Sequence, residues 1–274
     1  MKTIITCAMT GSVPSRDMNP SIPCTPKEVA EDVVRVWKSG ASICHVHVRD
    51  EQFKSSMDIA KFRETVKIIR GECDVVLNLT STTELDMSFE QRIAHIVELK
   101  PEMCSFNAGS INLFPDGILK SPIGFHKILA QATEECGVKP EMEIMDSGWI
   151  QNVLTYVKQG VLKAPLVFQL VLGIYSGIPA SPESLCYLKS LLPEGTNWSA
   201  FGIGKAHLPI MYTALALGGN IRVGLEDNMY YSKGKLASNN DLVMRAVRIV
   251  KEFGNEVATS DDARQILGLR GAKI

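Results

Sequence analysis

SICHVHVRD, residues 42–50, is a short apolar segment rich in β-branched residues, which predicts a β-strand. Side chains alternate between the two faces of a strand, so His45 and His47 point the same way from Cα atoms about 6.5–7 Å apart. Two imidazoles at that spacing can bind one metal ion, and zinc takes histidine nitrogen at about 2.0–2.1 Å. The alternative is two core histidines with separate hydrogen-bond partners. We favour the metal, because two such partners would have to fit into a confined space.

Strand and helix signals alternate along the rest of the chain. The segment TPKE, residues 25–28, has a capping threonine, a proline at the first helical position and a glutamate three positions after the cap, which predicts a helix start. The predicted strands span residues 3–9, 42–50, 74–80, 103–106, 139–145, 166–172, 198–203 and 220–223. The predicted helices span residues 26–39, 58–70, 88–99, 122–136, 147–159, 182–192, 207–217 and 239–253, with an extra C-terminal helix over 259–267.

Repeated strand–helix units in a chain of 274 residues predict an α/β fold, a (β/α)₈ TIM barrel that forms a single domain over residues 1–274. The alternative is an open, doubly wound sheet, which usually carries a G-x-G-x-x-G turn after its first strand. Here that turn reads TGSVP, residues 10–14, and does not match. We therefore expect the barrel, with its functional site at the C-terminal ends of the strands.

Composition excludes several classes of partner. The chain has 29 basic and 30 acidic residues, so no basic surface for nucleic acid is expected. It contains no run of 18 apolar residues, so a membrane span is not expected, and its apolar start is too short for a signal peptide. The seven cysteines include no C-x-x-C pair. They fit a protein of the reducing cytoplasm.

A third metal ligand is expected from the last strand. Closure of a barrel makes the eighth, first and second strands neighbours, so Glu226 would approach His45 and His47. Two histidines, one glutamate and an open position form a known catalytic zinc set, and cobalt or nickel would suit the same ligands. The alternative for Glu226 and Asp227 is a solvated loop. The nearby Arg222 favours a site, because few solvated loops combine a carboxylate pair with a guanidinium.

Further polar residues follow other strands. Glu143 and Glu141 share one face of a strand, where one of them would support a ligand histidine or pair with a basic residue at the rim. Possible hydrogen-bond donors to a substrate carboxylate are Thr80, Ser81, Ser105 and Asn107, although turns and helix caps use the same residue types. The segment GIGK, residues 202–205, is better interpreted as a plain turn than as a phosphate site.

These residues also occur in motifs that extend over essentially the whole chain. The motifs are TG (10–11), PCTPKE (23–28), HVHVRD (45–50), KPEM (100–103), NAG (107–109), PEME (140–143), GIGKAH (202–207) and GGNIRVGLEDN (218–228). With them the chain resembles the β-keto acid cleavage enzymes. The combination of HVHVRD with the last motif is the most specific part of this resemblance.

The resemblance implies a zinc-dependent (β/α)₈ enzyme that exchanges a β-keto acid with acetyl-CoA, giving acetoacetate and a new acyl-CoA. It implies that the metal ligands are His45, His47 and Glu226. It implies catalytic roles for Asp227, Arg222, Glu143 and Thr80, and substrate contacts from Ser81, Thr83, Ser105 and Asn107. Asp227 would be the base, with Arg222 beside it, and the acetyl-CoA methyl group would supply the nucleophile. A homotetramer is implied as well.

One position departs from the family pattern. The family's aminohexanoate enzyme has a glutamate after the first-strand TG that faces the substrate's amino group, and Val13 stands there in this sequence. We therefore expect an uncharged or apolar keto acid, with Trp149 and Tyr175 helping to line its pocket. A trimethylammonium substrate such as dehydrocarnitine stays open, because aromatic rings can bind such cations through their π faces. Two other functions stay open from the residues alone. They are a metal-dependent, amidohydrolase-like hydrolase and a non-catalytic barrel that binds a metabolite.

Overall fold

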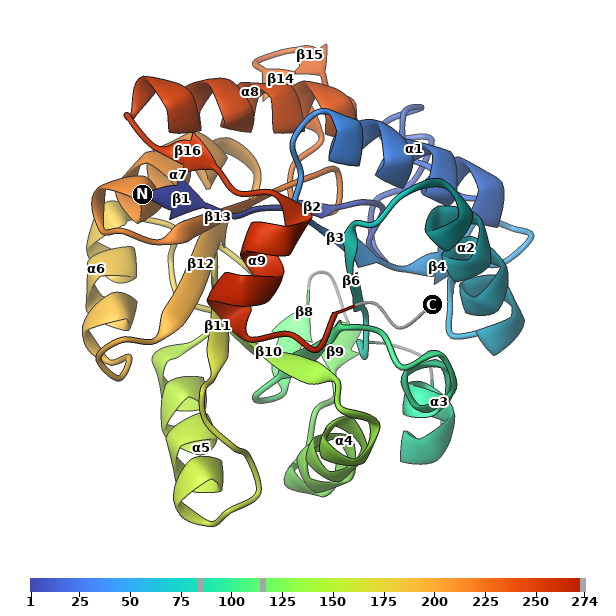
Figure 1. Ribbon diagram of the computed structural model, residues 1–274, viewed down its shortest axis with the longest axis vertical. Helices are drawn as coiled ribbons and strands as arrows, with labels where there is room; N and C mark the ends of the chain where they lie inside the picture. The colour runs from blue at the N-terminus through green and yellow to red at the C-terminus, as the bar shows by residue number, and fades with distance from the viewer. Residues whose placement is uncertain (83–85, 114–116, 272–274) are drawn as a thin grey trace.

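The computed structural model describes residues 1–82, 86–113 and 117–271, and its centre is a closed barrel of parallel strands in the order β10-β11-β12-β13-β2-β3-β6-β7 (Figure 1). The bounds are β2 Ile5–Ala8, β3 Ile43–Val46, β6 Val76–Leu79, β7 Met103–Asn107, β10 Lys139–Ile144, β11 Val167–Leu172, β12 Asn197–Gly202 and β13 Asn220–Val223. The predicted TIM barrel is therefore confirmed. Pairing of β13 with β2, and of β2 with β3, brings the last strand beside the histidine strand.

Helices follow the strands around the outside of the barrel (Figure 1). Their bounds are α1 Pro26–Lys38, α2 Ile59–Glu72, α3 Phe89–Leu99, α4 Ile123–Cys136, α5 Ser147–Lys158, α6 Pro182–Ser190, α7 His207–Ala216 and α8 Asn239–Glu252, with a 3₁₀ turn over Gly204–Ala206 before α7. Local chemistry sets these boundaries. Thr25 and Glu28 form the predicted capping box of α1, and Gly137, at φ +65°, ends α4.

The C-terminal helix α9, Ser260–Leu267, lies across one end of the barrel (Figure 1). Its Ala263 and Leu267 share an apolar cluster with Ile43, Val76 and Met103, which are the first residues of their strands. The helix therefore closes the N-terminal end of the barrel. Beside it, β1 (Lys2–Thr3) pairs with β16 (Glu256–Val257). The opposite end, where the strands finish, is left for the site.

Two predicted strands are divided in the structure. The strand predicted over residues 42–50 ends at Val46, and the chain continues into β4 (Val48–Arg49), which pairs outside the barrel with β5 (Ser55–Ser56). The strand predicted over residues 3–9 is interrupted at Ile4, whose amide donates to the side chain of Asn220. Two short hairpins were not predicted. They are β8 (Ile111–Leu113) with β9 (Gly117–Leu119), and β14 (Tyr230–Ser232) with β15 (Lys235–Leu236).

Two further observations concern the cysteines and the possibility of a membrane-spanning helix. All seven cysteines are free thiols, and five of them are buried among apolar side chains. Within the described ranges, no helix combines the length and the apolar character that a membrane crossing requires.

Candidate metal and substrate site

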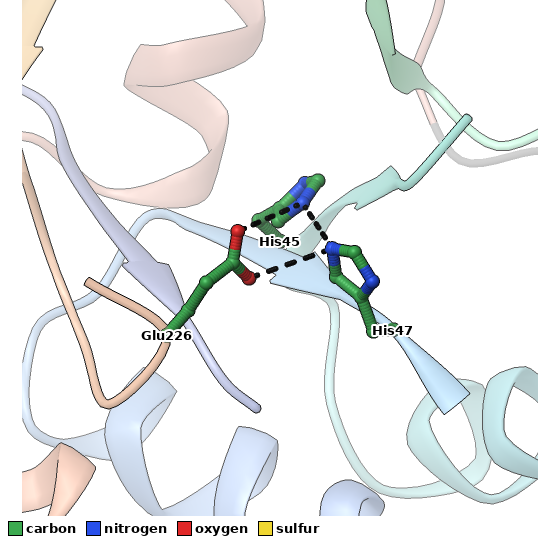
Figure 2. A group of neighbouring side chains, drawn as sticks. All are labelled: His45, His47 and Glu226. Atoms are coloured by element: carbon green, nitrogen blue, oxygen red, sulfur yellow. Dashed lines mark hydrogen bonds and ion pairs between the residues drawn. The ribbon is translucent and has the colours of Figure 1, made fainter. Parts of the chain in front are cut away.

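His45 and His47 converge as their alternation predicts. His45 is in β3, between Ala8 of β2 and Asn78 of β6, and His47 follows the end of that strand. The Nε2 atoms of the two rings lie 3.1 Å apart (Figure 2). Both side chains are buried, at 1% and 4% exposure. The strand therefore presents two imidazole nitrogens to one small space.

Glu226 completes this cluster from the other side of the barrel seam. It lies in the loop after β13, and its carboxylate oxygens are 3.7 Å from His45 Nε2 and 3.6 Å from His47 Nε2 (Figure 2). Donor atoms at about 2.0–2.1 Å from a tetrahedral zinc ion are roughly 3.3 Å apart, close to these separations. Glu226 Oε2 is buried and has no hydrogen-bond partner among the described residues. The donor set and its spacing therefore fit a divalent metal ion.

The protonation states also suit metal binding. Burial lowers the pKa of His45 to about 3, and it lowers the pKa of His47 as well. Burial alone would raise the pKa of Glu226, but the charge and hydrogen bond of Arg222, together with the neighbouring His45 and His47, outweigh it and lower that pKa to about 2. At neutral pH the rings are neutral and the carboxylate is ionised. Metal ligands require these forms.

Gly11 makes room for the Glu226 side chain. It has φ +59°, a conformation that favours glycine, and a Cβ placed on it would lie 2.6 Å from Glu226 Cγ. A side chain at position 11 would therefore displace the carboxylate from the histidines. The loop that contains Gly11 is held by Arg49, whose guanidinium donates to the carbonyls of Thr10, Gly11 and Pro14.

Arg222 connects the metal cluster to two further carboxylates. Its guanidinium contacts Glu226 at 2.7 Å, Asp227 at 2.8 Å and Glu143 at 3.2 Å, and its side chain is 2% exposed. It also lies over the ring of Phe201, 4.4 Å from the centroid. One buried cation therefore serves three acids. A divalent cation at the histidines would offset the remaining negative charge, which is a second reason why the residues fit a metal.

Burial raises the pKa values of Glu143 and Asp227, the two other acids that contact Arg222. Burial raises the pKa of Glu143 to about 8 and that of Asp227 to about 6, although Arg222 acts in the opposite direction on both. Both Asp227 oxygens accept from Arg222, Oδ2 from Nε and Oδ1 from Nη2. The neighbouring Glu141 instead accepts from Asn78. Glu143 is thus protonated at neutral pH and can hold a proton beside the cluster.

These groups form one end of a pocket of about 120 Å³ at the C-terminal end of the barrel. Its charged end contains His45, His47, Glu143, Arg222, Glu226 and Asp227. The remaining described wall is mainly apolar and comes from Val13, Pro14, Leu113, Leu119, Met145, Val171, Ile174, Phe201 and Ile203, with Ser12, Thr82 and Asn107 as polar members. The pocket therefore combines a group of charged side chains with a mainly apolar wall.

The structure brings only some of the predicted substrate residues to this pocket. Val13, 65% exposed, and Asn107 line it. Ser81 and Ser105 are fully buried and bond to each other instead, with Ser105 Oγ accepting from the Ser81 amide. Thr80 Oγ1 accepts from the Thr82 amide. Thr80, Ser81 and Ser105 are therefore not among the described residues that line the pocket, and their roles toward substrate stay predictions.

Two other predicted positions lie elsewhere. Thr83 falls outside the described residues. Trp149 is buried under Gly109, where a Cβ would lie 2.3 Å from the indole nitrogen, and it does not line the pocket. Sequence reasoning did not identify Arg49 as the residue that holds the loop at residues 10–14. It also missed the apolar wall. Met145 and Ile203 are the last residues of predicted strands and Val171 is the last but one, so their position near the C-terminal end of the barrel could have indicated the wall.

Comparison with known proteins agrees with this geometry. A family model described as beta-keto acid cleavage enzyme matches residues 2–269. The chain belongs to the beta-keto acid cleavage enzyme family. It is 38% identical, over 98% of both chains, to the 3-keto-5-aminohexanoate cleavage enzyme of Fusobacterium nucleatum. It is 32% identical to the 3-dehydrocarnitine:acetyl-CoA trimethylamine transferase of Rhizobium meliloti, over 98% of this chain and 97% of that one.

A solved structure supports the fold. The apo structure of ObcA superposes with a TM-score of 0.82 at 18% identity, covering 91% of this chain and 66% of that chain. At this identity the likeness concerns the fold alone. The family and the fold predicted from sequence are thus both confirmed, while the roles of individual site residues stay predictions.

Proposed function

We propose that this protein exchanges the acetate unit of a β-keto acid, with acetyl-CoA as the acceptor. The reaction is R–CO–CH₂–COO⁻ plus CH₃–CO–SCoA, giving CH₃–CO–CH₂–COO⁻ plus R–CO–SCoA. The observation that carries the proposal is the cluster of His45, His47 and Glu226 at the acidic end of an otherwise apolar pocket. Family membership and the acetyl-CoA-dependent relatives support the same reaction.

The atom balance changes one sequence-based expectation. Acetoacetate contains the acetyl group of acetyl-CoA and C1–C2 of the keto acid, so C2 of the keto acid is the nucleophile, not the acetyl-CoA methyl group. Loss of a C2 proton allows C2 to bond to the thioester carbon, and the coenzyme thiolate leaves. The thiolate then adds to the C3 ketone, the C2–C3 bond breaks, and C2 regains a proton. No oxidant or reductant is required.

The residues of the pocket can be assigned to these steps. Asp227 is the base that takes the C2 proton, and Arg222 orients it through two hydrogen bonds. Glu143 stores a proton at the charged end, because its pKa of about 8 keeps it neutral near pH 7. Asn107 lines the same pocket, and its Nδ2, which donates one hydrogen to Thr82 Oγ1, has a second hydrogen for the substrate carboxylate. Val13 contacts the substrate tail at the opposite side.

The metal has a limited and specific part in the proposal. His45, His47 and Glu226 would hold one divalent ion, zinc being the first candidate. When bound, such an ion supplies Lewis-acid stabilisation of negative charge on a ketone oxygen. The implied homotetramer and cytoplasmic location stay predictions.

The test is a panel of β-keto acids incubated with the purified protein, with and without acetyl-CoA. Acetoacetate and a new acyl-CoA should appear in equal amounts, and only when acetyl-CoA is present. Keto acid cleavage that proceeds without acetyl-CoA would contradict the exchange and favour the hydrolase alternative. That alternative has no further support, since the ligand cluster found among the described residues contains no third histidine.

A further inference from the structure

A second cavity adjoins the substrate pocket on its solvent side. It has a volume of about 400 Å³. Val13, Pro14 and Ile203 line both cavities, and so do the acids Glu226 and Asp227. The two spaces therefore meet at the carboxylates that also contact Arg222. We call them the inner pocket and the outer cavity.

The outer cavity has a different chemical character from the inner pocket. Its described wall away from the junction is formed mainly by Met18, Tyr175, Leu225, Met229 and Tyr230. Among all the described residues that line the outer cavity, the carboxylates are Glu226 and Asp227 at the junction, and there is no lysine, arginine or histidine. A second carboxylate ligand would be repelled there. A long, neutral and flexible group would not.

We propose that the outer cavity binds the pantetheine arm of acetyl-CoA, with the thioester at the junction with the inner pocket. This inference rests on the proposed function, because a two-substrate exchange must bring the thioester carbon to C2 of the keto acid. The keto acid carries a carboxylate and is suited to the end that contains Arg222. The neutral arm is suited to the apolar cavity, which leads from the junction to solvent.

The mouth of the outer cavity agrees with this assignment. Tyr175, Tyr230 and Met18 line it while remaining 58%, 47% and 47% exposed, so apolar surface reaches the outside of the protein there. Gly204 also lines the cavity, and the next residue, Lys205, is exposed and forms no ion pair with the described residues. The phosphates of the coenzyme would lie outside the mouth, where a free lysine is available to them.

The test compares two methionine-to-tryptophan variants. Met229 lines the outer cavity only, and Met244, 55% exposed on α8, lines neither cavity. M229W should weaken coenzyme A binding, measured by calorimetry, at least about ten-fold, which corresponds to about 1.4 kcal/mol. M244W should leave it unchanged. In steady-state assays the KM for acetyl-CoA should rise in M229W, while the KM for the keto acid stays within about two-fold of wild type.

The reciprocal variant and the other outcomes complete the test. L119F narrows the inner pocket only and should raise the KM for the keto acid, not that for acetyl-CoA. If M229W does not fold, M18W replaces it, because Met18 lines the same cavity at its exposed mouth. Unchanged coenzyme A binding in the folded outer-cavity variant overturns the inference. Wild-type protein that binds coenzyme A through this cavity but forms no acetoacetate would overturn the proposed function instead.

Discussion

Two arginines at opposite ends of the barrel each contact three carboxylates, and the two clusters differ in their access to water. At the C-terminal end, Arg222 contacts Glu143, Glu226 and Asp227, whose side chains are 8%, 17% and 6% exposed. At the N-terminal end, Arg264 of α9 contacts Glu102, Asp74 and Asp261, whose side chains are 2%, 63% and 80% exposed. The same set of side chains, one arginine with three carboxyl groups, therefore has different surroundings at the two ends.

The difference separates a structural cluster from a functional one. Water solvates two of the three acids around Arg264, and the buried Glu102 has a second cation in Arg70 at 2.8 Å. The acids around Arg222 are at most 17% exposed, and no second lysine or arginine among the described residues contacts them. Burying unbalanced charge costs free energy that a stable fold would otherwise avoid. A protein retains such a cluster where a ligand or metal supplies the missing charge.

The largest expected effect follows from replacing the ligand carboxylate. E226Q removes the negative charge from the set that contains His45 and His47, so the protein should lose bound metal. Activity should fall by more than about 100-fold, because even residues that only support a metal ligand contribute about 10–100-fold. Metal content by mass spectrometry and acetoacetate formation would be measured together. The control is E183Q, an exposed glutamate on α6. Full activity in metal-free E226Q would rule out the metal.

Replacing Arg222 should affect stability as well as activity. R222M leaves three buried acids without their shared cation, and breaking a buried ion network in this way costs about 3–5 kcal/mol. Activity should be lost too, because Asp227 loses both of its hydrogen bonds. Urea unfolding of R222M and wild type gives the difference in free energy of unfolding. An unchanged free energy would mean that these acids are neutral in the folded protein.

The matching change at the other end should affect stability alone. In R264M, Asp74 and Asp261 become solvated and Glu102 keeps Arg70, so we expect a loss of about 1–3 kcal/mol from the weakened contacts of one buried carboxylate. The turnover number should equal that of wild type. Parallel urea unfolding and activity assays would measure both. A loss of activity in folded R264M would remove the distinction between the two clusters.

The smallest expected effect is on how the free energy of unfolding changes with pH when Asp262 of α9 is replaced. The hydrogen bond from Lys2, together with the capping bonds from Thr259, lowers the pKa of Asp262 from 3.8 to about 2. A carboxylate with a lowered pKa stabilises the fold above the unfolded value, and this stability is lost as the pH falls from about 4 towards 2. The difference in free energy of unfolding between wild type and D262N should therefore be present at pH 6 and shrink below pH 3. A constant difference would contradict this.

The features that were predicted correctly from the sequence are those set by nearby residues or by a general property of the fold. The start of α1 was predicted correctly, because Thr25 and Glu28 form their capping box within one turn. The convergence of His45 and His47 needed only strand alternation, and the approach of Glu226 needed only barrel closure. These features depend on local chemistry or on a general property of the fold.

Features set by side-chain contacts between distant segments were not predictable. The strand of residues 42–50 divides after Val46, because Val48 and Arg49 pair with β5 and Arg49 binds the loop at residues 10–14. Ser81 and Ser105 satisfy each other across neighbouring strands, so neither reaches the pocket. No periodicity in the chain encodes such pairings. The burial of Ser81 and Ser105 therefore became visible only in the structure, and their predicted roles toward substrate stay predictions.

The pairing of β13 with β2 has a consequence for how the protein assembles. His47 and Glu226 come from nearly opposite ends of the chain, and they meet only after the last strand has joined the first. A partly folded chain that lacks this seam has no place for the ion. Metal binding would thus occur only after the barrel has closed between β13 and β2, and the bound ion would slow the separation of these two strands. Depleting the metal should loosen this seam before any other part of the barrel.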